Sequence, residues 1–106
     1  MGAVAALADF LNRRWAEEAQ EAKLFHELAC TVLAEGLPET CDCPCPARIY
    51  ERVAVDRRIL RGCEERITKE QQELCWSIDS TLAFTTMKVL ALPCELHSTY
   101  QYSWYP

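Results

Sequence analysis

The chain has 106 residues, of which half are hydrophobic, and a formal net charge of -5. This composition indicates one globular domain and excludes a disordered chain, and the negative charge argues against nonspecific binding to nucleic acid or to a membrane surface. The uncharged apolar run of residues 80–87 is too short to span a bilayer, so we expect no membrane partner.

Residues 4–35 predict one long helix, because they are rich in Ala, Leu, Glu and Gln, which favour helices. Gly36 and Pro38 then supply a stop signal. Apolar side chains and one histidine recur at steps of three and four residues, which places them on one face. They are Val4, Leu7, Ala8, Phe10, Leu11, Trp15, Ala19, Ala22, Phe25, His26, Leu28, Ala29, Val32 and Leu33.

Residues 47–74 predict a second helix, which follows a loop that contains three cysteines. Pro46 suits its first turn because the missing N–H needs no partner there. The expected inward seam is Ile49, Val53, Asp56, Leu60, Cys63 and Ile67, with Val55 and Ile59 beside it. Gly62 weakens the pattern, and its loosening after Ile67 predicts a break near residues 68–72.

Residues 81–92 predict a short third helix, with Asp79 or Ser80 as its N-cap and Pro93 after its end. The inward residues are predicted to be Leu82, Thr86 (or Phe84), Val89 and Leu92. The tail, residues 93–106, is rich in aromatic residues and is expected to dock on the helices. The chain is therefore predicted to be all-α: a long antiparallel helical hairpin, a short third helix and an ordered aromatic C-terminal tail, in one domain of residues 1–106.

The tail also carries a family resemblance. Val89-Leu-Ala-Leu-Pro93, followed by His97, Tyr100, Trp104 and Pro106, resembles the tail of an uncharacterised family of small actinobacterial and actinophage proteins. Pro46-Ala47-Arg48-Ile49 and Arg57-Arg58-Ile59-Leu60 are similar to a helix of that family. Cys94 and Ser98 depart from the family's pattern, which has Tyr and Pro there. The resemblance covers residues 46–106 and implies a phage-related origin, but no activity.

The cysteines are best explained in terms of their compartment. The N-terminus has no basic segment, and Asp9 interrupts its apolar run, so we expect no signal peptide and a cytoplasmic location. Disulfides are disfavoured in the cytosol, and seven cysteines cannot all pair within one chain. Metal ligation and buried free thiols are the two remaining interpretations.

A structural zinc site is the first candidate constellation. His26 and Cys30 share a helix face, and two thiols from Cys41, Cys43 and Cys45 would complete a tetrahedral set. Such a closed site would stabilise the fold and would leave no open position for catalysis. The alternative is that all five are ordinary residues with free thiols in the loop.

A second candidate metal set combines Cys94 and His97 with Cys63 or Cys75. Cys94 and His97 could also form a nucleophile and base, but no motif supplies an oxyanion hole or an orienting group. We therefore predict no catalytic residue and no enzymatic activity.

The partner-binding candidates are an arginine stripe on the second helix and two aromatic residues of the tail. They are Arg48, Arg52, Arg57, Arg58, Arg61, Tyr100 and Trp104. The sequence favours a non-enzymatic binding protein that acts on a host protein or by self-association, for example as a homodimer. The alternative is a nucleic-acid-binding regulator that uses the arginines.

Overall fold

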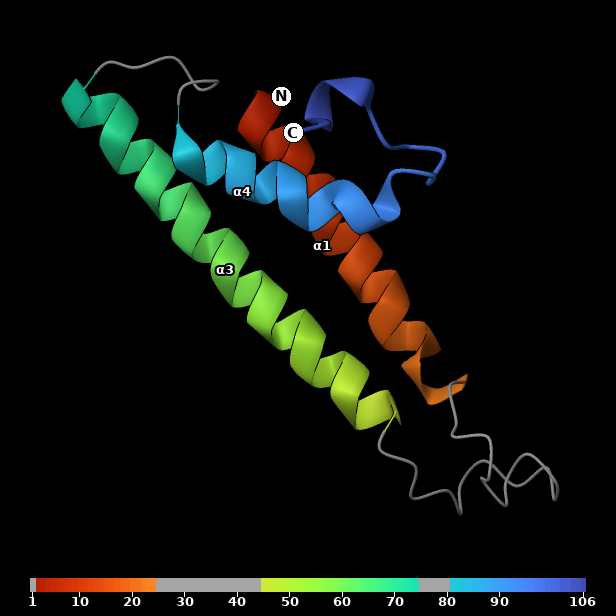
Figure 1. Ribbon diagram of the computed structural model, residues 1–106. Helices are drawn as coiled ribbons and strands as arrows, with labels where there is room; N and C mark the ends of the chain where they lie inside the picture. Colours follow the sequence, from red (N-terminus) through yellow and green to blue (C-terminus); the bar gives the residue numbers. More distant parts are fainter. Residues whose placement is uncertain (1, 25–44, 75–80) are drawn as a thin grey trace, which may run out of the picture.

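The computed structural model describes residues 2–24, 45–74 and 81–106, and within them it contains three α-helices and no strand (Figure 1). Helix α1 spans Ala3–Glu21 and continues into a 3₁₀ turn, η1, at Ala22–Leu24. Helix α3 spans Cys45–Leu74 and α4 spans Leu82–Ala91. Two further 3₁₀ turns, η4 at Leu92–Cys94 and η5 at Tyr102–Trp104, lie in the tail. The all-α prediction is confirmed.

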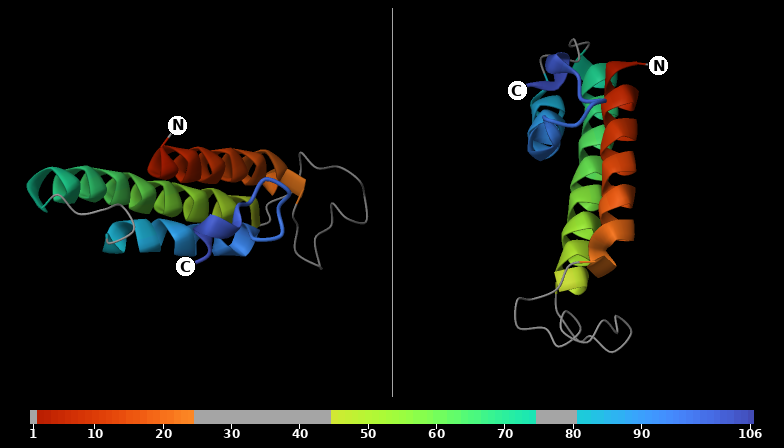
Figure 2. Two further views of the ribbon diagram at one scale, coloured as in Figure 1. Left: turned by 90° about the horizontal axis from the view of Figure 1, so that it is seen from above. Right: turned by 90° about the vertical axis from the view of Figure 1, so that its right-hand side faces the viewer.

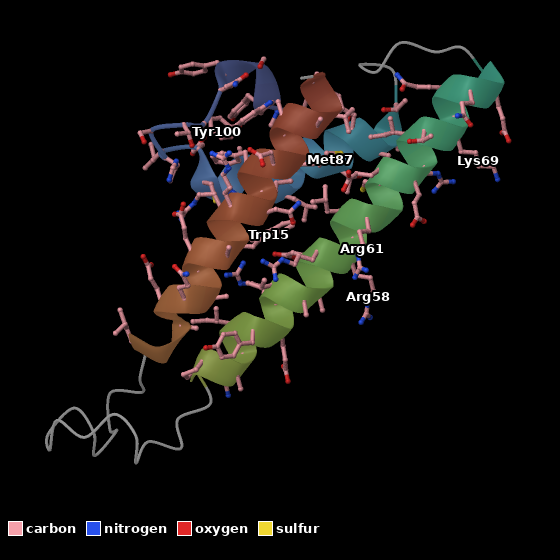
Figure 3. The ribbon with its side chains drawn as sticks, turned by 180° about the vertical axis from the view of Figure 1, so that it is seen from behind. Trp15, Arg58, Arg61, Lys69, Met87 and Tyr100 are labelled. Carbon is pink, nitrogen blue, oxygen red and sulfur yellow. The ribbon has the colours of Figure 1, made fainter. Side chains whose placement is uncertain are left out.

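Helices α1 and α3 form the predicted antiparallel hairpin. They run side by side in opposite directions, and α4 packs against both of them (Figure 2). The core lies where the three helices meet, and Figure 3 shows Trp15 of α1 and Met87 of α4 in this region. The buried core residues are Leu7, Ala8, Phe10, Leu11, Trp15, Val53, Leu60, Cys63, Ile67, Ala83, Phe84, Met87, Ala91 and Trp104.

Helix α1 buries the face that its sequence pattern predicts, but its length differs from the prediction. The α-helix ends at Glu21 rather than near residue 35, and the chain tightens into η1. Residues 25–35 lie outside the described part of the chain. Within the described part, Leu7, Leu11 and Trp15 are buried at steps of four, so the predicted inward face is confirmed there.

Helix α3 is longer and more regular than predicted. It begins at Cys45, and the predicted break near residues 68–72 is wrong. Ile67 is buried and anchors this part of the helix. The Arg66–Glu70 ion pair spans one turn beyond it, at 3.2 Å between Nε and Oε1. Such pairs four residues apart support a helix where apolar periodicity fades.

The predicted inward face of the third helix is wrong at three positions, although Phe84, the predicted alternative to Thr86, is buried. Helix α4 buries Ala83, Phe84, Met87 and Ala91, whereas the predicted Leu82, Thr86 and Val89 are exposed. The N-cap is Thr81, whose Oγ1 accepts a hydrogen bond from the Phe84 backbone N–H at 3.3 Å, rather than Asp79 or Ser80. Both faces of α4 carry apolar residues, so the larger Phe84 and Met87 select the face that packs.

The tail docks on α1, as predicted. Phe10 contacts three of its rings, with centroid separations of 5.7 Å to His97, 6.0 Å to Tyr100 and 4.8 Å to Trp104. Trp104 is only 4% exposed. Figure 3 shows Tyr100 beside α1. The tail thereby covers the side of α1 on which Phe10 lies.

Candidate interaction surface

An open groove of about 500 Å³ lies between α3 and α4. We call it the α3–α4 groove. Helix α3 contributes Ile59, Gly62, Cys63, Arg66 and Glu70, and α4 contributes Leu82, Ala83 and Thr86. Its floor is apolar and buried at Cys63 and Ala83, so a ligand that fills it would contact the core directly.

Two large apolar side chains stand exposed at the groove. Leu82 is 77% exposed and Ile59 is 40% exposed. Between them, Gly62 has no side chain, and a Cβ built on it would meet no heavy atom within 4 Å. The groove therefore combines apolar walls with free space, which is the combination that an interface core needs.

The rim of the groove is polar. Arg66 and Glu70 both line the groove, and Arg66 Nε donates to Glu70 Oε1 at 3.2 Å. Burial raises the pKa of the Cys63 thiol on the floor, and nearby Arg66 only partly opposes this effect. Cys63 is therefore held in its neutral form and belongs to the apolar surface.

The structure splits the predicted arginine stripe. Arg52 is drawn toward α1, where it pairs with Glu18, and its other guanidinium nitrogen lies 3.4 Å from Asp56 Oδ2. The hydrogen bond that Arg52 donates to Glu18 is the main reason that the pKa of Arg52 is raised. Figure 3 shows Arg58 and Arg61 pointing away from α1.

The remaining stripe arginines are not engaged in the described structure. Arg48, Arg58 and Arg61 are exposed, and none of them forms an ion pair with another described residue. Neither does Arg57, which is half-buried. The arginines of the stripe therefore do not form one continuous surface of unpaired charges. Arg52 is already neutralised by its acidic partners.

The side chains of Cys94 and His97 have other neighbours than the pairing of a nucleophile with a base would require. Arg14 lies beside Cys94 and pairs with Glu17. Nδ1 of His97 accepts from the Thr99 backbone N–H at 3.2 Å and lies 2.8 Å from Thr99 Oγ1. The other ring nitrogen, Nε2, lies 3.9 Å from Glu17 Oε2.

Arg14 is the centre of this small polar cluster. Burial lowers its pKa, but Cys94 and Glu17 raise it more strongly, so the net pKa of Arg14 is above its ordinary value. Its Nε is buried and has no hydrogen-bond partner. The cluster joins α1 to the start of the tail and orients His97 against Phe10.

The two metal hypotheses differ in how many of their residues the structure describes. Within residues 2–24, 45–74 and 81–106, no three side chains of His, Cys, Asp or Glu gather as metal ligands would. His26, Cys30, Cys41, Cys43 and Cys75 lie outside the described residues. Cys45 is described only as the first residue of α3. Cys63 and Cys94 are free thiols.

The two aromatic residues predicted to bind a partner are instead part of the fold. Trp104 is buried, and Tyr100 packs on Phe10 and Trp104. Burial raises the pKa of the Tyr100 hydroxyl, and its oxygen has no hydrogen-bond partner. The exposed tail residues are others, Tyr102 at 95% and Leu96 at 96%. No sequence signal distinguished these residues from the buried ones.

Comparisons of the chain with models of protein families, with curated proteins and with solved structures give no match. None of the described helices is both long enough and apolar enough to cross a membrane.

Proposed function

We propose that this protein is a non-enzymatic helical binding module that engages another protein, or a second copy of itself, through the α3–α4 groove. The observation that supports this function is the exposure of Leu82 and Ile59 over an apolar floor. Burial of such side chains contributes roughly 25 cal/mol per Å² of apolar surface, and large apolar residues in a pocket are typical binding hot spots.

The phage-related origin belongs to the same proposal. The tail motif from Val89 to Pro106 supports it through its resemblance to small actinobacterial and actinophage proteins. In the fold, that motif keeps α1 covered through His97, Tyr100 and Trp104. The tail part of the resemblance therefore concerns the scaffold, whereas the second matched segment, Arg57–Leu60, includes Ile59 of the groove.

Photo-crosslinking in the native host tests the binding function. A photoreactive phenylalanine analogue replaces Leu82 in one variant and Asn12, an exposed residue of α1, in the control. Leu82 should give adducts of defined mass that disappear when Ile59→Asp is added, and an adduct of twice the monomer mass would identify self-association. The absence of adducts from Leu82, or equal adducts from both positions, would contradict the proposal.

The alternative function is binding of nucleic acid, supported by the exposed guanidinium groups of Arg58 and Arg61. Affinity for DNA or RNA would then fall steeply with salt, because each phosphate contact releases a counterion. The double variant Arg58→Ala/Arg61→Ala would lower the salt slope by about two contacts. Binding that is absent, or that does not change with salt, would remove this alternative.

A structural zinc ion is the remaining part of the proposal, with His26, Cys30 and two of the three loop thiols as its four ligands. The loop thiols are Cys41, Cys43 and Cys45. The support for this zinc site is that the chain leaves η1 and re-enters at α3 at the same end of the hairpin (Figure 1). Native mass spectrometry under reducing conditions tests it. A mass increase of one zinc ion is expected, whereas a metal-free chain with seven free thiols would refute it.

A further inference from the structure

The outer face of α3 carries a second regular seam, which we call the outer seam. Arg48, Arg52, Val55, Ile59, Gly62, Arg66 and Lys69 follow one another at alternating steps of four and three residues. This spacing keeps side chains on one face of a helix. Ile59, Gly62 and Arg66 all line the α3–α4 groove, so the outer seam runs along that groove.

Charge is distributed symmetrically along the outer seam. Its centre is apolar, with Val55 51% exposed next to Ile59 and Gly62. Arginine and lysine stand at both ends, Arg48 and Arg52 before the centre and Arg66 and Lys69 after it. Basic residues at both ends are unexpected on a chain whose net charge is -5, which makes this arrangement informative.

Several of these basic groups are available to a ligand. Arg48 and Lys69 are exposed and form no ion pair with other described residues. Arg66 lines the groove and uses only Nε toward Glu70, so its two terminal nitrogens remain for a ligand. Guanidinium groups of this kind bind carboxylates in a fixed fork geometry.

The distribution argues against a second copy along this seam. In a parallel pair of α3 helices, Arg48 would meet Arg48 and Arg66 would meet Arg66. In an antiparallel pair centred on Ile59, the arginines before the centre would approach Arg66 and Lys69. Like charges that face each other across an interface disfavour association in both cases.

We propose that the α3–α4 groove binds an acidic amphipathic helix of a partner protein. This inference rests on the binding function proposed above. The partner helix would lie along α3, with apolar side chains between Ile59 and Leu82 and carboxylates at both ends. Arg48 and Arg66 are about 27 Å apart along the helix axis, so the partner segment needs about five turns. A phosphate backbone would leave the apolar centre without a partner, so the seam fits a protein better than nucleic acid.

A pair of synthetic peptides tests the charge assignment. Both are about 18 residues long, with leucines at alternating steps of four and three, and differ only in carrying Glu or Lys in the first and last turns. Fluorescence anisotropy with the full chain should show the Glu peptide binding at least about tenfold more tightly than the Lys peptide at low salt, and a smaller difference at high salt.

Matched variants locate the binding site. Ile59→Asp and Leu82→Asp should abolish binding of the Glu peptide, whereas Leu96→Asp, on the exposed tail, should leave it unchanged. Arg66→Ala/Lys69→Ala should remove most of the preference for Glu over Lys, and Arg13→Ala on α1 should not. Circular dichroism confirms that each variant is folded.

Cys63 gives a readout that does not depend on affinity. It lies on the groove floor, whereas Cys94 lies beside Arg14 at the tail. Bound Glu peptide should slow alkylation of Cys63 at least about threefold without slowing that of Cys94, as followed by peptide mass mapping. Equal protection of both thiols would overturn the placement of the peptide.

The other outcomes separate this inference from the proposed function. Equal binding of the two peptides at Ile59 and Leu82 would refute the acidic partner but retain the groove as a binding site. If neither peptide binds but Leu82 gives specific crosslinks, the acidic partner is likewise refuted and the groove is retained as a binding site. Single-stranded RNA or DNA could instead displace the Glu peptide and bind more tightly than the peptide does. That result would show that the outer seam binds nucleic acid.

Discussion

The indole of Trp104 and the ring of Phe10 lie with their centroids 4.8 Å apart and their planes inclined by 43°. This contact joins a residue near one end of the sequence to a residue near the other, and it is the tightest of the three ring contacts that Phe10 makes. Removal of either ring should therefore release the tail from α1.

Trp104→Ala should lower the free energy of unfolding by about 3–5 kcal/mol, since a buried indole and its contact with Phe10 are both lost. Tyr102→Ala, at a side chain that is 95% exposed, should change it by less than about 0.5 kcal/mol. Urea denaturation followed by far-ultraviolet circular dichroism measures both. Equal effects of the two substitutions would contradict the docked tail.

Thr81→Ala should destabilise the protein by about 1 kcal/mol, because the Phe84 N–H loses the oxygen that caps α4. Thr81→Ser keeps the hydroxyl and should retain most of the stability. Thr86→Ala, at an exposed position in the same helix, is the control. If the Ser variant were as unstable as the Ala variant, packing of the Thr81 methyl group would matter more than the cap.

Gly62→Ala should stabilise the isolated protein by about 0.5–1 kcal/mol. Glycine in a helix interior loses more backbone entropy on folding than alanine, and the added Cβ would meet no atom within 4 Å. The thermal midpoint measures the gain. The added methyl group would occupy the α3–α4 groove, so Gly62→Ala should lower the affinity for the Glu peptide. An unchanged affinity would mean that the peptide does not approach Gly62.

The pH dependence of stability should include a contribution from Cys63. Its pKa is raised in the folded chain by burial, so the native state keeps the thiol proton to higher pH than the unfolded state does. Stability from this group is constant at low pH and falls as the pH rises above the ordinary thiol pKa of about 8.5.

Comparison of wild type with Cys63→Ala isolates this contribution. The variant is less stable at neutral pH because it leaves a small cavity, and that difference should shrink as the pH rises above about 8.5. Urea titrations across this range measure it. A difference that stays constant would show that the Cys63 thiol does not titrate differently in the folded state.

The buried face of α1 could be predicted from the sequence, because Leu7, Leu11 and Trp15 leave only one face of the helix that can be buried. The sequence pattern failed for α4, where Leu82 and Val89 compete with Phe84 and Met87, and periodicity alone could not choose between the two faces. The choice depends on which face meets α1 and α3, and that is a tertiary property.

The sequence pattern did not predict the α3–α4 groove, for a related reason. Ile59 and Leu82 were both assigned near or on inward faces, so neither appeared available to a partner. Their exposure follows from the distance between α3 and α4 and from the missing side chain of Gly62, which no spacing rule reports. Conversely, Tyr100 and Trp104 look like binding residues by type but serve the fold.

The contact between Phe10 and the tail also has a consequence for synthesis of the protein on the ribosome. Phe10 is made early, but Tyr100 and Trp104, which cover it, are made 90 or more residues later. Helix α1 therefore presents an uncovered aromatic side chain while almost all of the remaining chain is translated. Nascent chains stalled before residue 100 should be the species that chaperones recognise, and emergence of Tyr100 and Trp104 from the ribosome should end that recognition.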